Sequence, residues 1–496
     1  MDTLFKLIKT LQKSEKRFFR LYAGRHVKGN NHNILLFDAI EKQKVYDEKA
    51  LKKKFHGSTI SKHFAFNKQY LYKQVLKALH QFHSPSSAEE IIKEQTHHIK
   101  ILFDRRLLDA CEKLIDKTLA LAKKYETYPE QIRLLEWKME MTAVRLFRGI
   151  SEKDILEIEA EMKSTLTRLA DYMYIYLEQR KLYFHAETRG ILMVRDHKEK
   201  YLKLGEKIKS KKVEGFRANL FREYFFELVN LNLSGNPQGT ETNIRNILAL
   251  VEKYPHIIKD NPREYQTTVY NYGIHKLYAR DYESAQQLAD QLKKFTDFAR
   301  LPPGPMQASL DFHAILQIGI YQGLYRYEEA EKYFEEFQKK QKKLEGLATN
   351  YSRQKVIYYV MSRLSFVTGH YKSSISHLSN LTSAKVSNER TDIDDYARIM
   401  QLLAFFVTEK TLSLETLSRT VRKSIAKNNN LFRIEKLVLD FVSRNNKHIH
   451  NKSLMYEQYS ALLQELNKIN TAGTKEEKLA LEYIDLIKWA EMQIKK

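Results

Sequence analysis

The chain has 496 residues, more than one compact core can organise, so we expect several domains or a stacked array of repeats. Its 16 glycines and 8 prolines are few for this length, which favours long helices. The single cysteine, Cys111, excludes an internal disulfide and favours a location in the reducing cytoplasm. The net charge of +23 favours anionic partners, while the longest run without a charged residue, 312–325, is too short for the roughly 20 residues of a membrane span.

Residues 1–85 are predicted to form a small basic helical module. Apolar residues at helical spacing predict helices over Thr3–Gln12, Glu15–Ala23, Ile34–Gln43, Asp47–Phe55 and Ser61–Phe82, with Ser14 as the N-cap of the second. The module has 18 Lys and Arg against 6 Asp and Glu, so over half of the net charge lies here. Ser84-Pro85-Ser86-Ser87 is the predicted linker, because proline ends a helix.

Residues 86–496 are predicted to form a helical solenoid. Amphipathic segments alternate with short polar joints, and the period-two alternation of strands is absent. The prolines lie at the expected joints, where a missing N–H is tolerated: Pro129, Pro237, Pro255, Pro262, Pro302, Pro303 and Pro305. The segment Asn428–Lys452, rich in Asn, Lys and His, is predicted to hold a long loop.

Three short segments recur at spacings of 45 and 44 residues. They are Tyr282-Glu-Ser-Ala285, Tyr327-Glu-Glu-Ala330 and Tyr371-Lys-Ser-Ser374. Each is predicted to begin the second helix of a hairpin, because an aromatic residue followed three positions later by a small one lets two helices pack closely. Gly369 supplies a tight turn before the third segment.

These segments resemble the tetratricopeptide repeat family, whose helix–turn–helix unit has a small residue in its first helix and a Tyr, Ala, Phe pattern in its second. Gly273, Tyr321, Tyr327, Ala330 and Phe334 match that pattern. The unit here is longer than the family's roughly 34 residues and lacks its Trp and closing Pro, so a related α-solenoid stays an alternative. The resemblance covers residues 265–381 most clearly and implies an all-α fold, a right-handed superhelix of helical hairpins.

The resemblance also implies a binding groove lined by the first helix of each hairpin. Its positions fall on Tyr270, Ile274, Leu277, Phe312, Ile315, Gln322, Tyr359, Arg363 and Phe366. These residues are mostly apolar or aromatic, so they would hold a peptide or helix by burial, with Arg363 available for a carboxylate. The alternative is that the long helices bury them against one another.

The predicted helix Ser61–Phe82 carries Lys62, Lys68, Lys73 and Lys77. Contact with nucleic-acid phosphates is one interpretation of these lysines, and a solvated face that keeps the protein soluble is the other. Helix-turn-helix geometry with Asp47–Phe55 is conceivable, although the intervening residues 56–60 are more than the usual three or four. The aromatic residues of the module are assigned to its core: Phe18, Phe19, Tyr22, Phe64, Phe66, Tyr70 and Tyr72.

We expect no catalytic, metal or cofactor site. No dinucleotide fingerprint or P-loop occurs, and Gly473-Thr474-Lys475 is interpreted as a joint before the last helix. Glu94 and His97 have the spacing of a di-iron bundle, but the second copy that such a site needs is absent. His448 and His450 lack cysteine or acidic neighbours, and Cys111 is interpreted as a core residue.

Two functions from different classes therefore remain open. The first is a non-catalytic scaffold or adaptor that binds a protein or peptide partner on the concave face. The second is a regulator whose residues 1–85 bind nucleic acid, while the solenoid senses a partner. Duplex binding with strong salt dependence by residues 1–85 distinguishes the second from the first. An unrecognised enzyme ranks third.

Overall fold

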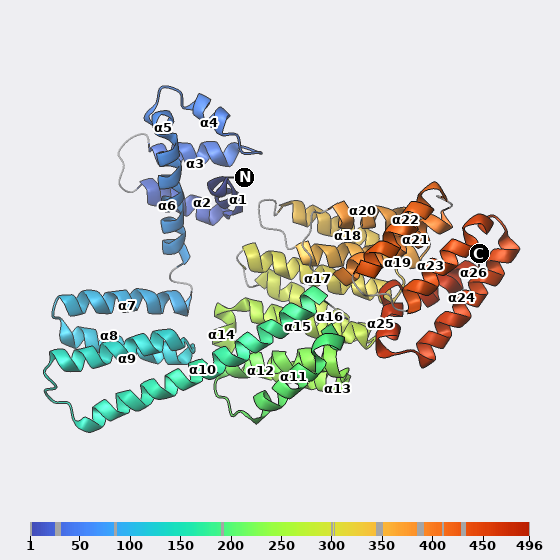
Figure 1. Ribbon diagram of the computed structural model, residues 1–496. Coiled ribbons are helices and arrows are strands. Elements are labelled where there is room, and N and C mark those ends of the chain that lie inside the picture. The colour runs from blue at the N-terminus through green and yellow to red at the C-terminus, as the bar shows by residue number, and fades with distance from the viewer. Residues whose placement is uncertain are drawn as a thin grey trace.

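The computed structural model describes residues 2–24, 31–83, 87–189, 193–298, 301, 303–343, 351–383, 391–408, 411–427 and 433–495. Over these residues it is all-helical, without a strand, as the sequence predicted. Figure 1 shows the first six helices as a group set apart from the stacked helices that follow. The predicted linker residues Ser84, Pro85 and Ser86 lie outside the described residues. None of the described helices is long and apolar enough to cross a membrane.

The N-terminal group, which we call the head, consists of α1 to α6. Their bounds are Thr3–Thr10, Lys13–Gly24, His32–Lys42, Glu48–Lys54, Thr59–Lys62 and Phe64–His83. Residues from all six helices form one apolar core, in which Phe19 packs on Phe37 with ring centroids 4.5 Å apart. At its C-terminal end α6 contacts α2, through the Phe18–Phe82 ring pair and a 2.7 Å contact between His83 Nε2 and Glu15 Oε1.

Two details of the predicted head helices were wrong. Ser14 is not the N-cap of α2, because the helix begins at Lys13, two residues before the predicted start, and Ser14 lies within it. The Glu15 carboxylate accepts a 2.6 Å hydrogen bond from the Gln12 N–H before the first turn. The predicted helix Ser61–Phe82 is divided into α5 and α6 at His63, whose backbone leaves the helical region at φ −122° and ψ 44°.

The stacked helices begin with a series in which each hairpin packs on the next. Their bounds are α7 Ala88–Asp104, α8 Leu108–Lys124, α9 Tyr128–Val144, α10 Glu152–Arg189, α11 Met193–Ser210, α12 Phe216–Leu228, the π-helical turn η3 Val229–Ser234, α13 Pro237–Lys253 and α14 Pro255–Asp260. The long α10 spans two layers, since it packs on α9 near its start and on α12 further along. Pro129, Pro237 and Pro255 lie in the first turns of helices, as predicted.

The predicted repeats follow as regular hairpins: α15 Pro262–Tyr278, α16 Tyr282–Phe298, α17 Pro303–Gly323, α18 Tyr327–Lys343, α19 Tyr351–Val367, α20 Tyr371–Ser383, α21 Thr391–Val407 and α22 Thr411–Lys427. Tyr282, Tyr327 and Tyr371 each begin the second helix of a hairpin, as the recurring segments predicted. The first helices pack in sequence, α15 on α17 and α17 on α19.

The C-terminal helices are α23 Arg433–Asn445, the 3₁₀ turn η4 Asn446–His448, α24 Lys452–Ala472, α25 Lys475–Ile484 and α26 Leu486–Ile494. The prediction of a long loop over Asn428–Lys452 was wrong for residues 433–445, which form α23; residues 428–432 lie outside the described residues. Ile434, Val438 and Val442 are buried at helical spacing, a pattern that the polar composition obscured. The last helix, α26, turns back to pack on both α24 and α19.

Candidate functional site

The predicted groove residues do not line an open surface in this structure. Five of them are buried: Phe312, Ile315, Gln322, Tyr359 and Phe366; Tyr270, Ile274, Leu277 and Arg363 are half-buried. The aromatic ring of Tyr270 stacks on that of Phe312, 4.2 Å between centroids. The long helices bury the side chains between neighbouring hairpins, which is the alternative that the pattern left open.

The chain's own C-terminal helices cover the groove positions of α19. Trp489 of α26 is fully buried and stacks on Phe366 with ring centroids 5.7 Å apart. The Tyr359 hydroxyl donates a 2.7 Å hydrogen bond to the backbone oxygen of Tyr483 in α25. Arg363 also has a partner within the array. With the side-chain amide of Gln322 oriented so that its oxygen faces Arg363, that oxygen accepts hydrogen bonds from the guanidinium. A partner would have to displace α25 and α26 to reach this face.

The residues predicted to pack the repeats lie between helices. Ala285, Ala330 and Ser374 are fully buried, and Phe334 is nearly so. The Tyr327 ring stacks on His370 with centroids 3.6 Å apart, and its hydroxyl donates to Ser373 Oγ. The other predicted packing residues also lie between helices or in their turns. The Tyr282 ring lies against Gly323, and the Leu316 side chain lies against Gly273. Gly369 has a positive φ of 85° in its turn, and the Tyr371 hydroxyl accepts a hydrogen bond from Gln493.

The interior of the array holds buried carboxylates. Burial raises the pKa of Glu227 to about 7, although a hydrogen bond from Asn271 partly opposes the shift. Burial likewise raises the pKa of Asp311 to about 6, against hydrogen bonds from Gln307 and Gln341. Among the described residues no group of three His, Cys, Asp or Glu side chains is placed to hold a metal ion. Cys111 is buried and packs in the core, as predicted.

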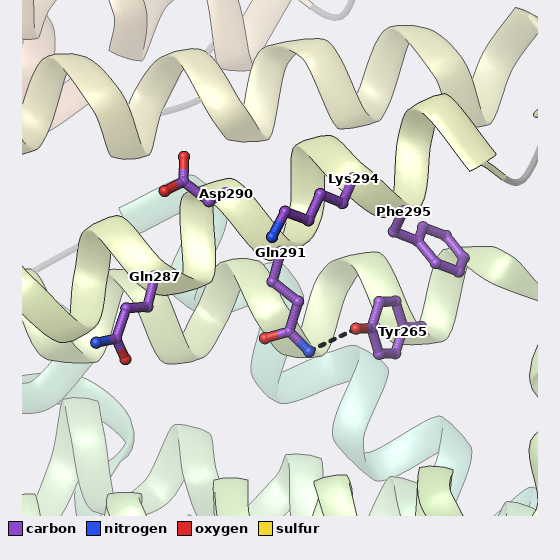
Figure 2. Close-up of a pocket in the computed structure, with 6 residues that line it drawn as sticks. All are labelled: Tyr265, Gln287, Asp290, Gln291, Lys294 and Phe295. Carbon is purple, nitrogen blue, oxygen red and sulfur yellow. Dashed lines mark hydrogen bonds between the residues drawn. The ribbon is translucent and has the colours of Figure 1, made fainter.

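A shallow hollow of about 500 Å³ lies beside α16. Figure 2 shows the side chains that line it. It is lined by Tyr265, Gln287, Asp290, Gln291, Lys294 and Phe295. Gln291 Nε2 donates a 2.6 Å hydrogen bond to the Tyr265 hydroxyl, so two of its polar groups satisfy each other. The hollow lacks the enclosed walls and converging polar groups of a small-molecule site.

The head differs from the array in that each of its acidic side chains contacts another group of the head. Asp38 and Glu41 pair with Arg20, and Glu41 also with Lys16. Glu15 contacts His83, and Asp47 caps α4 by accepting from the Ala50 N–H. Asp2 and Glu48 pair with Lys68, and Glu48 also with Lys52. Five of the head's six carboxylates thus contact Lys16, Arg20, Lys52, Lys68 or His83, and the sixth, that of Asp47, caps a helix.

Lys68 is held by ion pairs within the head, so a contact with nucleic acid, which stays a prediction, would have to compete with them. Its ammonium group lies 2.8 Å from Asp2 and 3.0 Å from Glu48, and it donates to the Tyr46 hydroxyl. Burial lowers the pKa of Lys68, but these hydrogen bonds outweigh it and raise the pKa above its ordinary value. Hydrogen bonds from Lys52 and Lys68 lower the pKa of Glu48 to about 2.

A set of exposed lysines runs from α4 to α6, and in the described part of the head none of them forms an ion pair. The set is Lys49, Lys53, Lys54, Lys62, Lys73 and Lys77. Lys62, Lys73 and Lys77 are exposed as predicted, while the three on α4 were missed. Their sequence signal was the run of lysines at the end of a short amphipathic helix.

Two aromatic residues accompany the lysines on the outer face of α6. Phe66 is 69% exposed and Tyr70 44% exposed, and their rings stack with centroids 6.3 Å apart. Their assignment to the core was wrong, because the buried face of α6 is made by Phe64, Leu71 and Val75 on the opposite side. At about 100° per residue, Phe66, Tyr70, Lys73 and Lys77 share an arc of about 60°.

The connection between α4 and α5 has the length of a helix-turn-helix turn. Only four residues, 55–58, lie between Lys54 at the end of α4 and Thr59 at the start of α5. The sequence predicted a joint of five residues, 56–60. Gly57 has φ +80°, a conformation that a side chain disfavours, and nothing lies within 4 Å of where its Cβ would be. Turns of three or four residues, often with glycine, join the helices of DNA-binding helix-turn-helix units.

Comparisons of the chain with protein-family models, with curated proteins and with solved structures gave no match.

Proposed function

We propose that this chain is a non-catalytic nucleic-acid-binding regulator, in which the head binds a duplex and the helical array, a tetratricopeptide-like superhelix, contacts a protein partner. One observation carries this proposal: the head uses all six of its carboxylates internally and leaves lysines exposed along a helix–turn–helix unit. The cytoplasm is the proposed location.

The head is suited to a polyanion because its positive charge is uncompensated at the surface. Lysines that neutralise phosphates release condensed counterions, which supplies most of the affinity of sequence-independent binding. The second helix of a helix-turn-helix unit enters the major groove. Here the helix after the turn is the short α5, Thr59–Lys62, which His63 separates from α6, so Lys73 and Lys77 lie on the helix that follows it. Phe66 and Tyr70 would add apolar contact beside Lys73 and Lys77.

The adaptor function has weaker support. The groove positions of α19 are covered by α25 and α26, and those of α17 are buried. Only Tyr270, Ile274 and Leu277 on α15 and Arg363 on α19 keep some exposed surface. A protein partner of the array would therefore bind outside the predicted groove.

The test is a fluorescence-anisotropy titration of the full chain with a labelled mixed-sequence duplex at several salt concentrations. The variant K73Q/K77Q removes two charges from the outer face of α6. If both lysines contact phosphates, the slope of log K against log salt falls by about 1.8, since each contact contributes about 0.9.

The matched control is K332Q/K339Q, which removes two exposed charges from α18 in the array. We expect this control to bind the duplex as the unsubstituted chain does. If K73Q/K77Q bound the duplex with the same affinity and the same salt slope as the unsubstituted chain, the proposal would be overturned. A single strand of the same sequence is titrated in parallel, and tighter binding of that strand would replace duplex by single-stranded nucleic acid as the ligand.

A further inference from the structure

The long helix α10 has two apolar faces. One face packs inward, where Ile175 and Leu182 are fully buried against α12 and its neighbours. On the other face Leu166, Met173 and Leu177 are 47%, 41% and 52% exposed, and Ala170 between them is also exposed. Figure 1 shows this helix running from beside α9 to the stacked helices around α12. We call the exposed set Leu166, Ala170, Met173 and Leu177 the outer stripe.

The outer stripe has the spacing of a coiled-coil seam. Its residues follow one another at intervals of four, three and four, so at about 100° per residue they share an arc of about 60°. Seams of this spacing receive the side chains of a second helix as knobs into holes. A helix face that only contacts water has no need of apolar residues at these intervals. The outer stripe is therefore suited to packing against a second helix.

The outer stripe is complementary to itself when reversed. In an antiparallel pair centred between residues 171 and 172, Leu166 lies opposite Leu177 of the second helix, and Ala170 lies opposite Met173. The small Ala170 then faces the larger Met173 of the other copy, which lets the two layers interdigitate. A two-fold contact requires this self-complementarity, because the same surface must serve on both copies.

The charges beside the outer stripe also fit a second copy. Lys163 pairs with Glu159, and Lys181 pairs with Glu178, all within α10. The guanidinium of Arg180 lies over the rings of Tyr176 and Phe221 at 5.1 and 5.3 Å, on the inward side. The flanks are thus locally neutral, which selects neither an acidic nor a basic partner and avoids repulsion between copies.

We infer that the outer stripe is the contact of an antiparallel homodimer. At roughly 200 Å² for each large apolar side chain, Leu166, Met173 and Leu177 expose about 300 Å² in each copy, the size of patch that is often functional. Two copies bury less than the roughly 1,200 Å² of stable complexes, so the dimer is weak and its population depends on protein concentration. Nucleic acid plays no part in it.

Sedimentation velocity of the full chain from about 1 to 100 μM, without nucleic acid, tests the association. We expect the sedimentation coefficient to rise with concentration towards that of a dimer, and L166E/L177E to stay monomeric throughout. The control is L107E, at a leucine that is also 52% exposed but lies before α8. A monomer at all concentrations, or a dimer that L166E/L177E leaves intact, would overturn the inference.

Cysteine cross-linking tests the orientation. Native Cys111 is fully buried, so it is shielded from the reaction. In the antiparallel pair a mixture of L166C and L177C chains, treated with an added thiol oxidant, forms a disulfide between copies. L166C alone does not, because its two cysteines lie about 16 Å apart along the helix axis at 1.5 Å per residue. Cross-linking of L166C alone in preference to the mixture contradicts the antiparallel arrangement.

Discussion

Pairs of glycine and leucine set the distance between the first helices of neighbouring hairpins. A Cβ at Gly273 of α15 would lie 2.6 Å from a methyl carbon of Leu316 in α17. In return, a Cβ at Gly319 of α17 would lie 2.7 Å from a methyl carbon of Leu277 in α15. Each helix therefore receives a leucine from the other. Leu277, predicted to line the groove, packs at this crossing instead.

Replacing Gly273 by alanine is expected to destabilise the array. Leu316 is fully buried and cannot move aside freely, so overpacking should cost about 1 to 3 kcal/mol. The control is G304A in the first turn of α17, where nothing lies within 4 Å of the added Cβ. Thermal unfolding followed by circular dichroism should show a lower Tm for G273A only; equal values for the two variants would contradict the close crossing.

Helix ends in the array are capped by residues from distant elements. Asp260, at the end of α14, accepts a 2.7 Å hydrogen bond from the Ala88 N–H at the start of α7. Glu126, between α8 and α9, accepts from the N–H groups of Phe216 and Arg217 at the start of α12. A carboxylate at a helix N-terminus also interacts favourably with the helix dipole. These two contacts fasten α7 to α9 onto α12 to α14.

Removing the Asp260 cap should loosen α7 from the array. D260A leaves the Ala88 N–H without its partner, a loss of about 0.5 to 2 kcal/mol for an N-cap. Hydrogen exchange of the full chain should quicken at the first turn of α7. D47A, which removes a cap within the head, should quicken exchange at α4 alone. Unchanged exchange at α7 in D260A would show that its packing does not depend on the cap.

Elements with a strong local signal could be predicted from the sequence, and those set by distant contacts could not. The apolar spacing and the prolines gave the helices, and the recurring segments gave the starts of α16, α18 and α20. The exposure of Lys62, Lys73 and Lys77 followed from the amphipathic pattern. The ion pairs of Lys68 could not be predicted in this way, because one of its partners, Asp2, is far away in the sequence.

At the scale of the whole molecule, the array closes on itself. The C-terminal helices α25 and α26 return to α19, so helices more than 100 residues apart share one core. The groove residues Tyr359 and Phe366 could not be recognised as buried from local pattern, since their partners Tyr483 and Trp489 follow only at the end of the chain. Fold-back of this kind is a property of the complete chain.

Trp489 is expected to hold this closure. It is fully buried between Phe366 and Tyr459, with ring centroids 5.7 Å from each, so W489A should cost about 3 to 5 kcal/mol by leaving a cavity. The matched control is W137A, at the chain's other tryptophan, which is only partly buried in α9. We expect a lower Tm and more binding of a hydrophobic dye for W489A than for W137A. Equal effects would mean that α26 contributes little to the closure, and the face of α19 would then be open to a partner.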